Sequence, residues 1–353
     1  MNNLNNQIIN DPCAGPTLTV GCMFDRISLL PEPQYIYRGI VYPSLGVVFG
    51  PAKSGKTIFT ENLLLSLAAG RETYLGDKIY TPSNRVLIVS LEEFYRNRTA
   101  RNKKQIESFT ERYQLDPSWS DEVYIVDDTF PRYIHSDKDW QLLEREIARI
   151  MPAVVVIDSL TRLTTESIED SAVATRIMKK LREMTHKFGI TVIVIHHSQK
   201  LENKPITIAS LAGSRVVGQE LDFMIGVNRT YNNIRYLKDV AYRYASDDTD
   251  QVLKFRINDS QIIESAGFCT EAELFASGNG GQMNDSDALV LQYLIEKTGN
   301  DESIIVLTAD LYQYFIDSQI LTRPTLHAAL NRLVSTSAIE KVAKGEYRIR
   351  VAS

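Results

Sequence analysis

Two kinds of segment alternate along the first part of the chain. Short runs are wholly apolar, and in the longer runs between them apolar residues recur every three or four positions. The short runs have the length of strands. Strands that are apolar on both faces are typical of a parallel sheet covered by helices on both sides. The strands predicted in this way lie at residues 45–49, 86–90, 123–126, 153–158 and 190–195. The pattern therefore predicts an α/β fold.

The longer runs predict the helices that connect these strands. Gly70, Pro152 and Gly189 follow three of the runs and act as stop signals. A further, more polar helix is expected to end near Tyr113. The three runs with a stop signal predict helices at residues 56–69, 139–150 and 172–188.

From Leu221 onward the pattern changes to strands separated by polar turns, with Asn-Asn at 232–233 and Asn-Asp at 258–259 as turn signals. We expect these strands to extend the sheet as an antiparallel meander. They are predicted at residues 222–229, 234–244 and 251–257. One more short strand is expected near residues 35–37.

Residues 285–353 show a separate pattern of three amphipathic helices followed by a two-stranded ribbon, which resembles a winged helix. The helices are predicted at residues 285–296, 308–316 and 323–334, and the strands at 339–343 and 347–351. The residues available for DNA contact are Arg323, His327, Arg332, Lys341, Lys344, Arg348 and Arg350. Acidic residues outnumber basic ones here, so a role in protein contact or as a lid stays open.

The predicted organisation has four parts. They are an N-terminal arm at residues 1–26, an α/β domain at 27–268, a linker at 269–284 and a winged-helix domain at 285–353. The linker contains the Gly-rich stretch 277–282, whose composition is typical of a flexible segment.

Composition and charge limit the environment and the partners of the chain. The formal net charge of −5 gives no global basic field, so contact with nucleic acid must come from local patches. Cys13, Cys22 and Cys269 are odd in number and form no C-x-x-C pair, which indicates a reducing compartment. No apolar run reaches the roughly 20 residues of a membrane span, and residues 1–16 lack the features of a secretory signal. We expect a cytoplasmic protein without a membrane partner.

The most specific chemical signal follows the first core strand, where the sequence fits the G-x-x-x-x-G-K-[ST] pattern. In this context the loop amides and the start of the next helix form a nest for a polyphosphate. Lys56 can reach the β- and γ-phosphates of ATP, and Thr57 can offer its hydroxyl to Mg²⁺. The predicted nucleotide-binding residues are Gly50, Pro51, Ala52, Lys53, Ser54, Gly55, Lys56, Thr57 and Ile58.

Three further candidates stand at the ends of other predicted strands, where open α/β sheets place their ligands. Asp158 is the candidate metal anchor, acting on Mg²⁺ with Thr57; it could instead only cap the residues that follow. Glu92 is the first candidate for the catalytic base and Glu93 the second, although both suit the start of a helix. His197, in preference to His196, is the candidate sensor of the γ-phosphate. The sequence therefore predicts an ATP-hydrolysing site.

These stretches, in this order, resemble the RecA-like ATPase family that includes the RepA-type plasmid replicative helicases. DnaB-type helicases, RadA and KaiC are more distant relatives. The matching residues are 50–57, 90–93, 155–162, 195–198 and 211–215. The resemblance implies a catalytic base at Glu92, a sensor strand that ends in two histidines, and a homo-oligomeric, usually hexameric, ring with ATP between subunits.

The resemblance also implies an arginine that a neighbouring subunit contributes to each ATP site. Arg243 is the best match for this finger, and Arg215 is a rival. The DnaB-like members carry a lysine two residues earlier, where this chain has Ala241; Lys238 has the wrong spacing to replace it. This departure weighs against an analogy with the fast helicases.

The loop at residues 198–214 corresponds to the segment that faces the axis of such a ring. Lys200 and Lys204 could contact the phosphates of single-stranded nucleic acid there, although the loop carries no aromatic residue for base stacking. DNA is therefore expected at this loop, at the winged helix, or at both, and a protein partner is possible at residues 285–353.

Three functions remain open at this point. The first is a ring ATPase that acts on DNA, such as a RepA-like replicative helicase or helicase-like protein of a mobile element. The second is an ATP-dependent oligomeric switch whose winged helix binds DNA or a protein. The third is a recombinase-type ATPase that forms filaments.

Overall fold

The fold is known from a computed structural model. It describes residues 17–198, 201, 204–213, 215–230, 233–246, 250–276, 285–299, 301, 303–318, 320–335, 338–343 and 345–350. The predictions made for residues 1–16, for the linker residues 277–284, and for Lys200, Ser214 and Lys344 lie outside this part of the chain.

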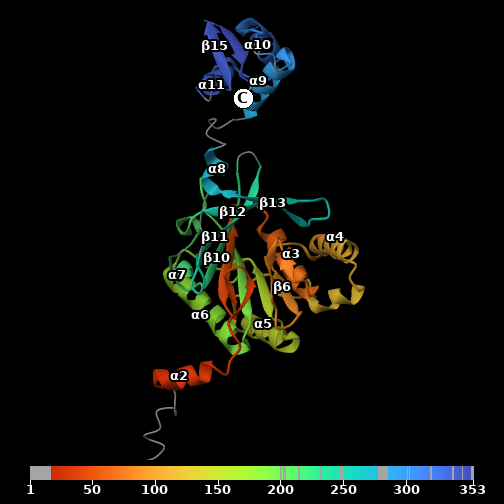
Figure 1. The fold of residues 1–353 in the computed structure, drawn as a ribbon, viewed down its shortest axis with the longest axis vertical. Helices are drawn as coiled ribbons and strands as arrows, with labels where there is room; N and C mark the ends of the chain where they lie inside the picture. The colour runs from red at the N-terminus through yellow and green to blue at the C-terminus, as the bar shows by residue number, and fades with distance from the viewer. Residues whose placement is uncertain are drawn as a thin grey trace, which may run out of the picture.

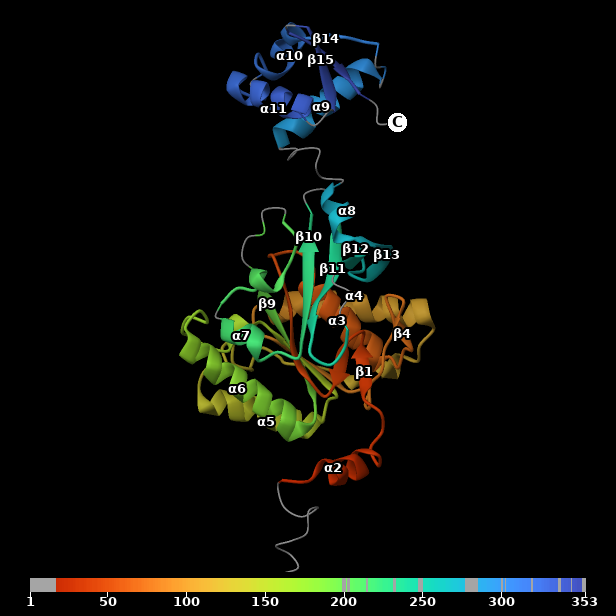
Figure 2. The same cartoon turned by 60° about the vertical axis from the view of Figure 1, so that its left-hand side comes forward.

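The centre of the molecule is a nine-stranded sheet (Figures 1 and 2). Its strands, in spatial order, are β13 (Ile263–Thr270), β12 (Gln251–Ile257), β11 (Arg235–Tyr242), β10 (Phe223–Arg229), β3 (Leu45–Gly50), β9 (Thr191–His197), β8 (Val154–Asp158), β6 (Val86–Ser90) and β7 (Val123–Ile125). The strands from β10 to β7 are parallel, whereas β11, β12 and β13 add in antiparallel fashion. The predicted fold class is therefore confirmed, and β13 is a strand that the sequence pattern did not reveal.

Helices cover both faces of this sheet, as the doubly apolar strands require. On one face, α3 (Lys56–Ala68) and α4 (Tyr95–Tyr113) pack over a core that includes Phe59 and Ile88. On the other face, α5 (Asp137–Ile150) and α6 (Ser171–Phe188) pack over a core that includes Leu143 and Val155. The loop of residues 50–57 between β3 and α3, called the P-loop below, is thus supported by packed cores on both faces of the sheet.

Local sequence signals set the ends of these helices. Ser136 and Asp139 form a capping box at the start of α5, and the Asp170 carboxylate caps α6 by accepting from two backbone N–H groups. Gly189 ends α6 in the left-handed region with a φ of 60°. The predicted stop after α6 is confirmed.

Several short elements complete the core. They are β1 (Gln34–Tyr37), β2 (Ile40–Tyr42), β4 (Thr73–Tyr74), β5 (Asp77–Lys78), α7 (Arg215–Gln219) and 3₁₀ turns at Pro117–Glu122, Leu160–Arg162 and Ile208–Ser210. The region expected to be an N-terminal arm contains helix α2 (Val20–Ile27), which the polar neighbouring sequence had hidden.

Residues 269–276 do not form part of a linker, in contrast to our prediction. They are the end of β13 and helix α8 (Glu271–Ala276). The reason is a buried polar network in which Glu271 accepts hydrogen bonds from Tyr236 Oη (2.7 Å) and from the Ile206 backbone N–H (3.0 Å) and forms an ion pair with Lys238. A carboxylate at this position holds α8 against β11.

The C-terminal residues have an apolar core of their own. Their elements are α9 (Asp285–Thr298), β14 (Val306–Leu307), α10 (Thr308–Phe315), α11 (Arg323–Ser335), β15 (Ile339–Ala343) and β16 (Glu346–Ile349), with sheet order β14-β16-β15. The three helices and the hairpin follow the predicted pattern, and β14 is added to the sheet. Among the described residues, no helix has both the length and the apolar character needed to cross a membrane.

Candidate functional site

The loop between β3 and α3 is shaped by two glycines, at which a side chain would clash with the backbone or strain it. A Cβ on Gly50 would lie 1.9 Å from the carbonyl oxygen of Val227 in the adjacent strand β10. Gly55 has a φ of 112°, a region that favours glycine, and its Cβ would lie 3.2 Å from Ile257 Cδ1. The backbone therefore adopts the close, inward-facing path that the sequence motif predicts.

Two polar groups of the loop fit a phosphate ligand. The Lys56 ammonium donates to the carbonyl oxygens of Gly50 (3.0 Å) and Pro51 (2.8 Å), and burial lowers its pKa to about 8. The Ser54 hydroxyl is buried and has no hydrogen-bond partner among the described residues. A buried cation and a buried unpaired hydroxyl are groups that a bound phosphate would satisfy.

The two predicted metal ligands lie in contact with each other. Thr57 Oγ1 donates a hydrogen bond of 2.7 Å to Asp158 Oδ2. Asp158 ends strand β8 and is buried, and burial raises the pKa of its carboxyl to about 6. A hydroxyl and a carboxylate are the hard oxygen ligands that Mg²⁺ prefers, so this pair fits the predicted metal position.

The two adjacent glutamates, Glu92 and Glu93, contact different partners. Glu92 Oε1 accepts a hydrogen bond from Ser159 Oγ and lies 4.0 Å from His197 Nε2. The nearby His197 imidazole, assisted by the Ser159 hydroxyl, lowers the pKa of Glu92 to about 2 despite partial burial. Glu93 instead binds Arg101, with 2.7 Å between Arg101 Nη1 and Glu93 Oε1. Of the two, Glu92 faces the candidate site.

The Glu93 side chain belongs to a structural cluster. Arg101 also forms two hydrogen bonds to the buried Glu61 of α3, at 2.7 and 3.0 Å. This cluster ties α4 to α3 behind the site. The charges of Glu93 are therefore committed to holding two helices together.

The two histidines at the end of β9 also differ in environment. His197 is paired in register with Gly50 of the neighbouring strand β3, and its side chain is partly exposed beside Glu92. His196 is buried; its Nε2 lies 3.0 Å from the Ala212 carbonyl oxygen, and burial lowers its pKa to about 4. His197 thus lies at the predicted sensor position, whereas His196 anchors the loop that follows.

Arg243 lies far from the P-loop of its own chain. Its backbone N–H binds the Asp222 carbonyl oxygen at 2.8 Å, and its Nη2 donates to the Gln219 carbonyl oxygen at 3.0 Å. Asp222 immediately precedes β10, whose first residue is paired with Gly46, so Arg243 stands at the end of the sheet opposite Gly50. The structure does not bring Arg243 together with the other candidates within one chain.

The other candidate cations have different surroundings. Lys238 is buried in the ion pair with Glu271 and is therefore not available as a finger. Arg215 is exposed at the start of α7, in the segment that follows the loop after β9.

The described part of the predicted axial loop is held at both ends. Ser198 forms an isolated bridge with Leu211, and the Ala212 N–H donates to the His197 carbonyl oxygen at 3.2 Å. Lys204 is exposed, and its carbonyl oxygen accepts from Asn228 Nδ2 at 3.3 Å. The loop therefore begins and ends beside His197.

Sequence reasoning missed three neighbours of the site, Ser159, Phe255 and Ile257. Ser159, the residue that follows Asp158, binds Glu92; its place directly after a strand-end carboxylate was the available signal. Phe255 and Ile257 of β12 approach the loop at Gly55, which only the strand order reveals because they are distant in sequence.

The glycine-lined cradle, the Thr57–Asp158 pair and the strand-end side chains of Glu92 and His197 lie together at one edge of a mostly parallel sheet, in the arrangement of a P-loop nucleotide site. Residues 23–203 match the family model described as AAA domain. Because this match covers just over half of the 353 residues, the chain belongs to the AAA domain family. Membership implies that a nucleotide, and typically Mg²⁺, is used here.

Solved structures include a similar protein, a KaiC-like protein from the hyperthermophilic archaeon Pyrococcus horikoshii OT3. The sequences are 17% identical, the similarity covers 64% of this chain and 91% of the other, and the TM-score is 0.47. The comparison with curated proteins gives no match.

Proposed function

We propose that this chain hydrolyses ATP as a ring of identical subunits and acts on DNA, as a RepA-like replicative helicase or helicase-like protein of a mobile element does. The observation that carries the proposal is the arrangement of Glu92 and His197 beside the P-loop, on strands whose ends meet at one edge of the sheet. A protein that only binds nucleotide has no need of an ionised carboxylate at this position.

The chain's own residues supply the main parts of the reaction. Lys56 and the loop amides bind the phosphates, and Glu92, held ionised, accepts a proton from the attacking water. Mg²⁺, when bound near Thr57 and Asp158, would neutralise charge on the phosphates. His197, between Glu92 and β3, is placed to respond to loss of the γ-phosphate.

The apolar side chains of Phe255 and Ile257 extend the cradle beyond the phosphates. Because they lie against Gly55, they offer a surface for the flat base of ATP beside the P-loop. The position of Arg243 at the far end of the sheet supports its use by a neighbouring subunit in a ring. We propose that such a neighbour completes each ATP site.

The C-terminal unit has the element order and sheet order of a winged helix, which supports its assignment as one. We place DNA at the loop of residues 198–214, where Lys204 is exposed, and at the exposed Arg323 of α11. The tyrosine ring of Tyr312 lies 5.0 Å from the Arg323 guanidinium carbon and orients it.

The deciding experiment measures ATP hydrolysis by the full chain with and without single-stranded DNA, together with mass photometry at the same protein concentration. The proposal expects hydrolysis that single-stranded DNA stimulates at least severalfold, and a closed oligomer of defined mass. A monomeric protein whose rate of ATP hydrolysis is the same with and without single-stranded DNA would exclude a ring motor.

A second function, an ATP-dependent switch, is favoured by the charges of the C-terminal unit. Arg332 binds Asp287 at 2.6 Å, and Arg348 and Arg350 bind Glu340 at 2.7 and 3.3 Å. Three of the basic residues expected to contact DNA therefore pair with carboxylates of their own unit. This supports a protein partner for residues 285–353.

The switch differs from the motor in its measurable behaviour. It predicts slow hydrolysis, little stimulation by DNA, and partner binding that disappears when residues 285–353 are removed. A recombinase-type filament, the third function, would appear in negative-stain images as open helices in place of closed rings.

A further inference from the structure

The residue at the start of α4 is an exposed phenylalanine, at a position where polar residues are favoured. Phe94 is the N-cap of this helix, is 76% exposed and makes no side-chain capping hydrogen bond. Serine, threonine, aspartate and asparagine stabilise a helix at this position, because their side chains accept from its free N–H groups. Phe94 neither caps the helix nor lies in the core. Such a departure from the local stability rules is expected where a residue serves a contact.

Two arginines stand beside this phenylalanine and a second exposed ring. Arg132 Nη1 donates to the carbonyl oxygen of Glu93, directly before Phe94, at 2.7 Å. The guanidinium carbon of Arg162 lies 4.6 Å from the ring centre of Tyr133, which is 40% exposed. Within the described ranges, neither guanidinium forms an ion pair with a carboxylate. Both positive charges are therefore available to a ligand.

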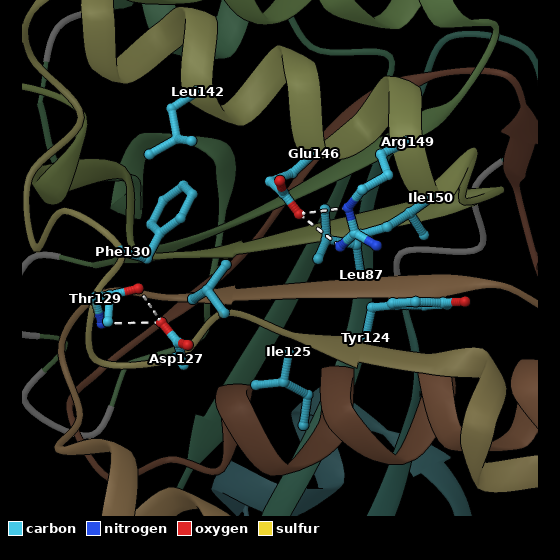
Figure 3. A pocket seen from close by; sticks show the side chains of 11 residues that line it. Leu87, Tyr124, Ile125, Asp127, Thr129, Phe130, Leu142, Glu146, Arg149 and Ile150 are labelled. Atoms are coloured by element: carbon cyan, nitrogen blue, oxygen red, sulfur yellow. Dashed lines mark hydrogen bonds and ion pairs between the residues drawn. The ribbon is translucent and has the colours of Figure 1, made fainter.

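The segment between β7 and α5, which carries the second ring, is fixed at both ends. At its start, Asp127 Oδ1 accepts from the N–H and from the hydroxyl of Thr129, at 2.9 and 2.6 Å (Figure 3). At its end, the Ile134 N–H donates to the Arg162 carbonyl oxygen at 2.8 Å. The ring and the guanidinium groups are thus in position before a ligand binds, which lowers the conformational entropy lost on binding.

Exposed rings beside unpaired guanidinium groups fit a single-stranded nucleic acid. The bases of a single strand stack on aromatic rings and on guanidinium planes, and its phosphates pair with arginine. A double helix hides its base faces from such stacking, and an apolar peptide would leave both cations unpaired. The rings and the charges together therefore favour a single strand over these two ligands.

We propose that Phe94, Arg132, Tyr133 and Arg162, called the aromatic surface below, bind single-stranded nucleic acid, with bases on the rings and phosphates on the guanidinium groups. These residues are distinct from the loop of residues 198–214 and from α11, where the proposed function places DNA.

The aromatic surface borders the candidate hydrolysis site. The Thr161 hydroxyl, directly before Arg162, lies 3.4 Å from Glu92 Oε1, and Glu92 is two positions from Phe94. A strand held here would therefore contact the immediate neighbours of the candidate base. The inference rests on the proposed function only for the expectation that the chain meets nucleic acid, so its test measures binding without ATP.

Fluorescence anisotropy measures the binding of a labelled oligothymidylate of about 20 nucleotides, longer than one site of this kind, to the full chain. Phe94→Leu keeps an apolar side chain but removes the flat ring, and should raise the Kd at least about fivefold. Phe268→Leu is the matched control, because Phe268 is 53% exposed and lies 5.7 Å from the Arg38 guanidinium carbon, but Arg38 is paired with Asp77. Equal Kd values for the two variants would overturn the proposal.

A second variant reads stacking directly. Phe94→Trp retains a flat ring, and the two native tryptophans, Trp119 and Trp140, are buried. We expect Phe94→Trp to bind the oligothymidylate at least as tightly as the unsubstituted chain, with quenching of its tryptophan emission that the unsubstituted chain does not show. Emission that stays constant at saturation would contradict stacking at this position.

The phosphate contact is tested through the salt dependence of binding. Arg162→Gln should reduce the slope of log K against log salt concentration by about 0.7. Arg145→Gln, at an exposed arginine of α5, should leave the slope unchanged. The same slope in both variants would reject Arg162 as a phosphate ligand.

An oligouridylate and a DNA duplex complete the comparison. The oligouridylate shows whether RNA or DNA is the preferred strand, and a loss in Phe94→Leu with either one supports the proposal. Duplex binding should not change in Phe94→Leu, because paired bases cannot stack on the ring; an equal loss with duplex would contradict stacking. If single strands bind but Phe94→Leu has no effect, this inference alone fails. If the full chain binds neither single strand, the proposed motor on single-stranded DNA fails with it.

Discussion

Thr57 and Asp158 stand 101 positions apart in the sequence, and a hydrogen bond of 2.7 Å joins their side chains. This contact links the first turn of α3 to the end of β8. It places the two oxygen groups expected to serve Mg²⁺ at one point of the sheet edge, beside the phosphate cradle.

Replacing Asp158 with asparagine should therefore weaken the use of Mg²⁺ more than the binding of nucleotide. We expect Asp158→Asn to raise the Mg²⁺ concentration needed for half-maximal hydrolysis about 10- to 100-fold. A magnesium titration of ATPase activity measures this. Asp170→Asn is the control, because asparagine caps a helix as well as aspartate does; an equal shift in both variants would argue against a metal role.

Glu92→Gln should retain ATP binding and lose hydrolysis by about 10²-fold or more, because the amide cannot accept the proton of water. Glu93→Gln should instead loosen the contact with Arg101 and lower the melting temperature while hydrolysis persists. Single-turnover hydrolysis and thermal melting separate the two effects. The reverse pattern would move the catalytic base to Glu93.

The pH dependence of hydrolysis should reflect the environment of Glu92. The nearby His197 lowers the pKa of Glu92 to about 2, and a lowered pKa favours the ionised form, so this base stays active as the pH falls well below neutral. His197→Ala removes the largest cause of the shift and should move the acid limb of kcat/KM to higher pH. An acid limb that is unchanged in this variant would show that another group controls it.

Arg243 can be tested by mixing inactive subunits. Arg243→Ala and Lys56→Ala should each abolish hydrolysis, whereas mixed assemblies contain interfaces in which an intact P-loop meets an intact arginine. We expect partial recovery of activity on mixing, up to about a quarter if assembly is random. Mixing Arg215→Ala with Lys56→Ala tests the rival residue, and recovery with that pair alone would assign the finger to Arg215.

The network around Glu271 makes a prediction about stability. Glu271→Ala leaves Lys238 buried without its partner and should lower the free energy of unfolding by about 3–5 kcal/mol. Glu264→Ala removes the exposed pair between β13 and Arg112 of α4 and should cost at most about 1 kcal/mol. Urea denaturation of both variants gives the comparison, and similar losses would show that the network contributes little.

The repeating strands and helices of the core could be predicted because their apolar patterns are strong and local. The strand predicted at residues 86–90 and that at 251–257 agree with β6 and β12. In contrast, β13 has only one buried residue along its length, so no apolar run marked it. Helix α8 was missed because the burial of Glu271 depends on Lys238 and Tyr236, which come from another strand.

The site residues that belong to a sequence motif could be predicted. Those whose position depends on packing between distant elements could not. The cradle and Asp158 follow from strand-end positions in the sequence. The choice between Glu92 and Glu93 rests on Arg101 and Ser159, whose contacts cross from other elements. The surroundings of Arg243 could likewise not be predicted from the sequence. They depend on the antiparallel strands that bring Arg243 back beside Asp222.

Glu271 also connects three separate elements of the structure. Its carboxylate joins the first turn of α8 to β11 and to Ile206, in the middle of the loop that returns to His197 through Ala212. Glu271 therefore couples α8 to β11 through Lys238, and to the loop that ends beside His197 through Ile206.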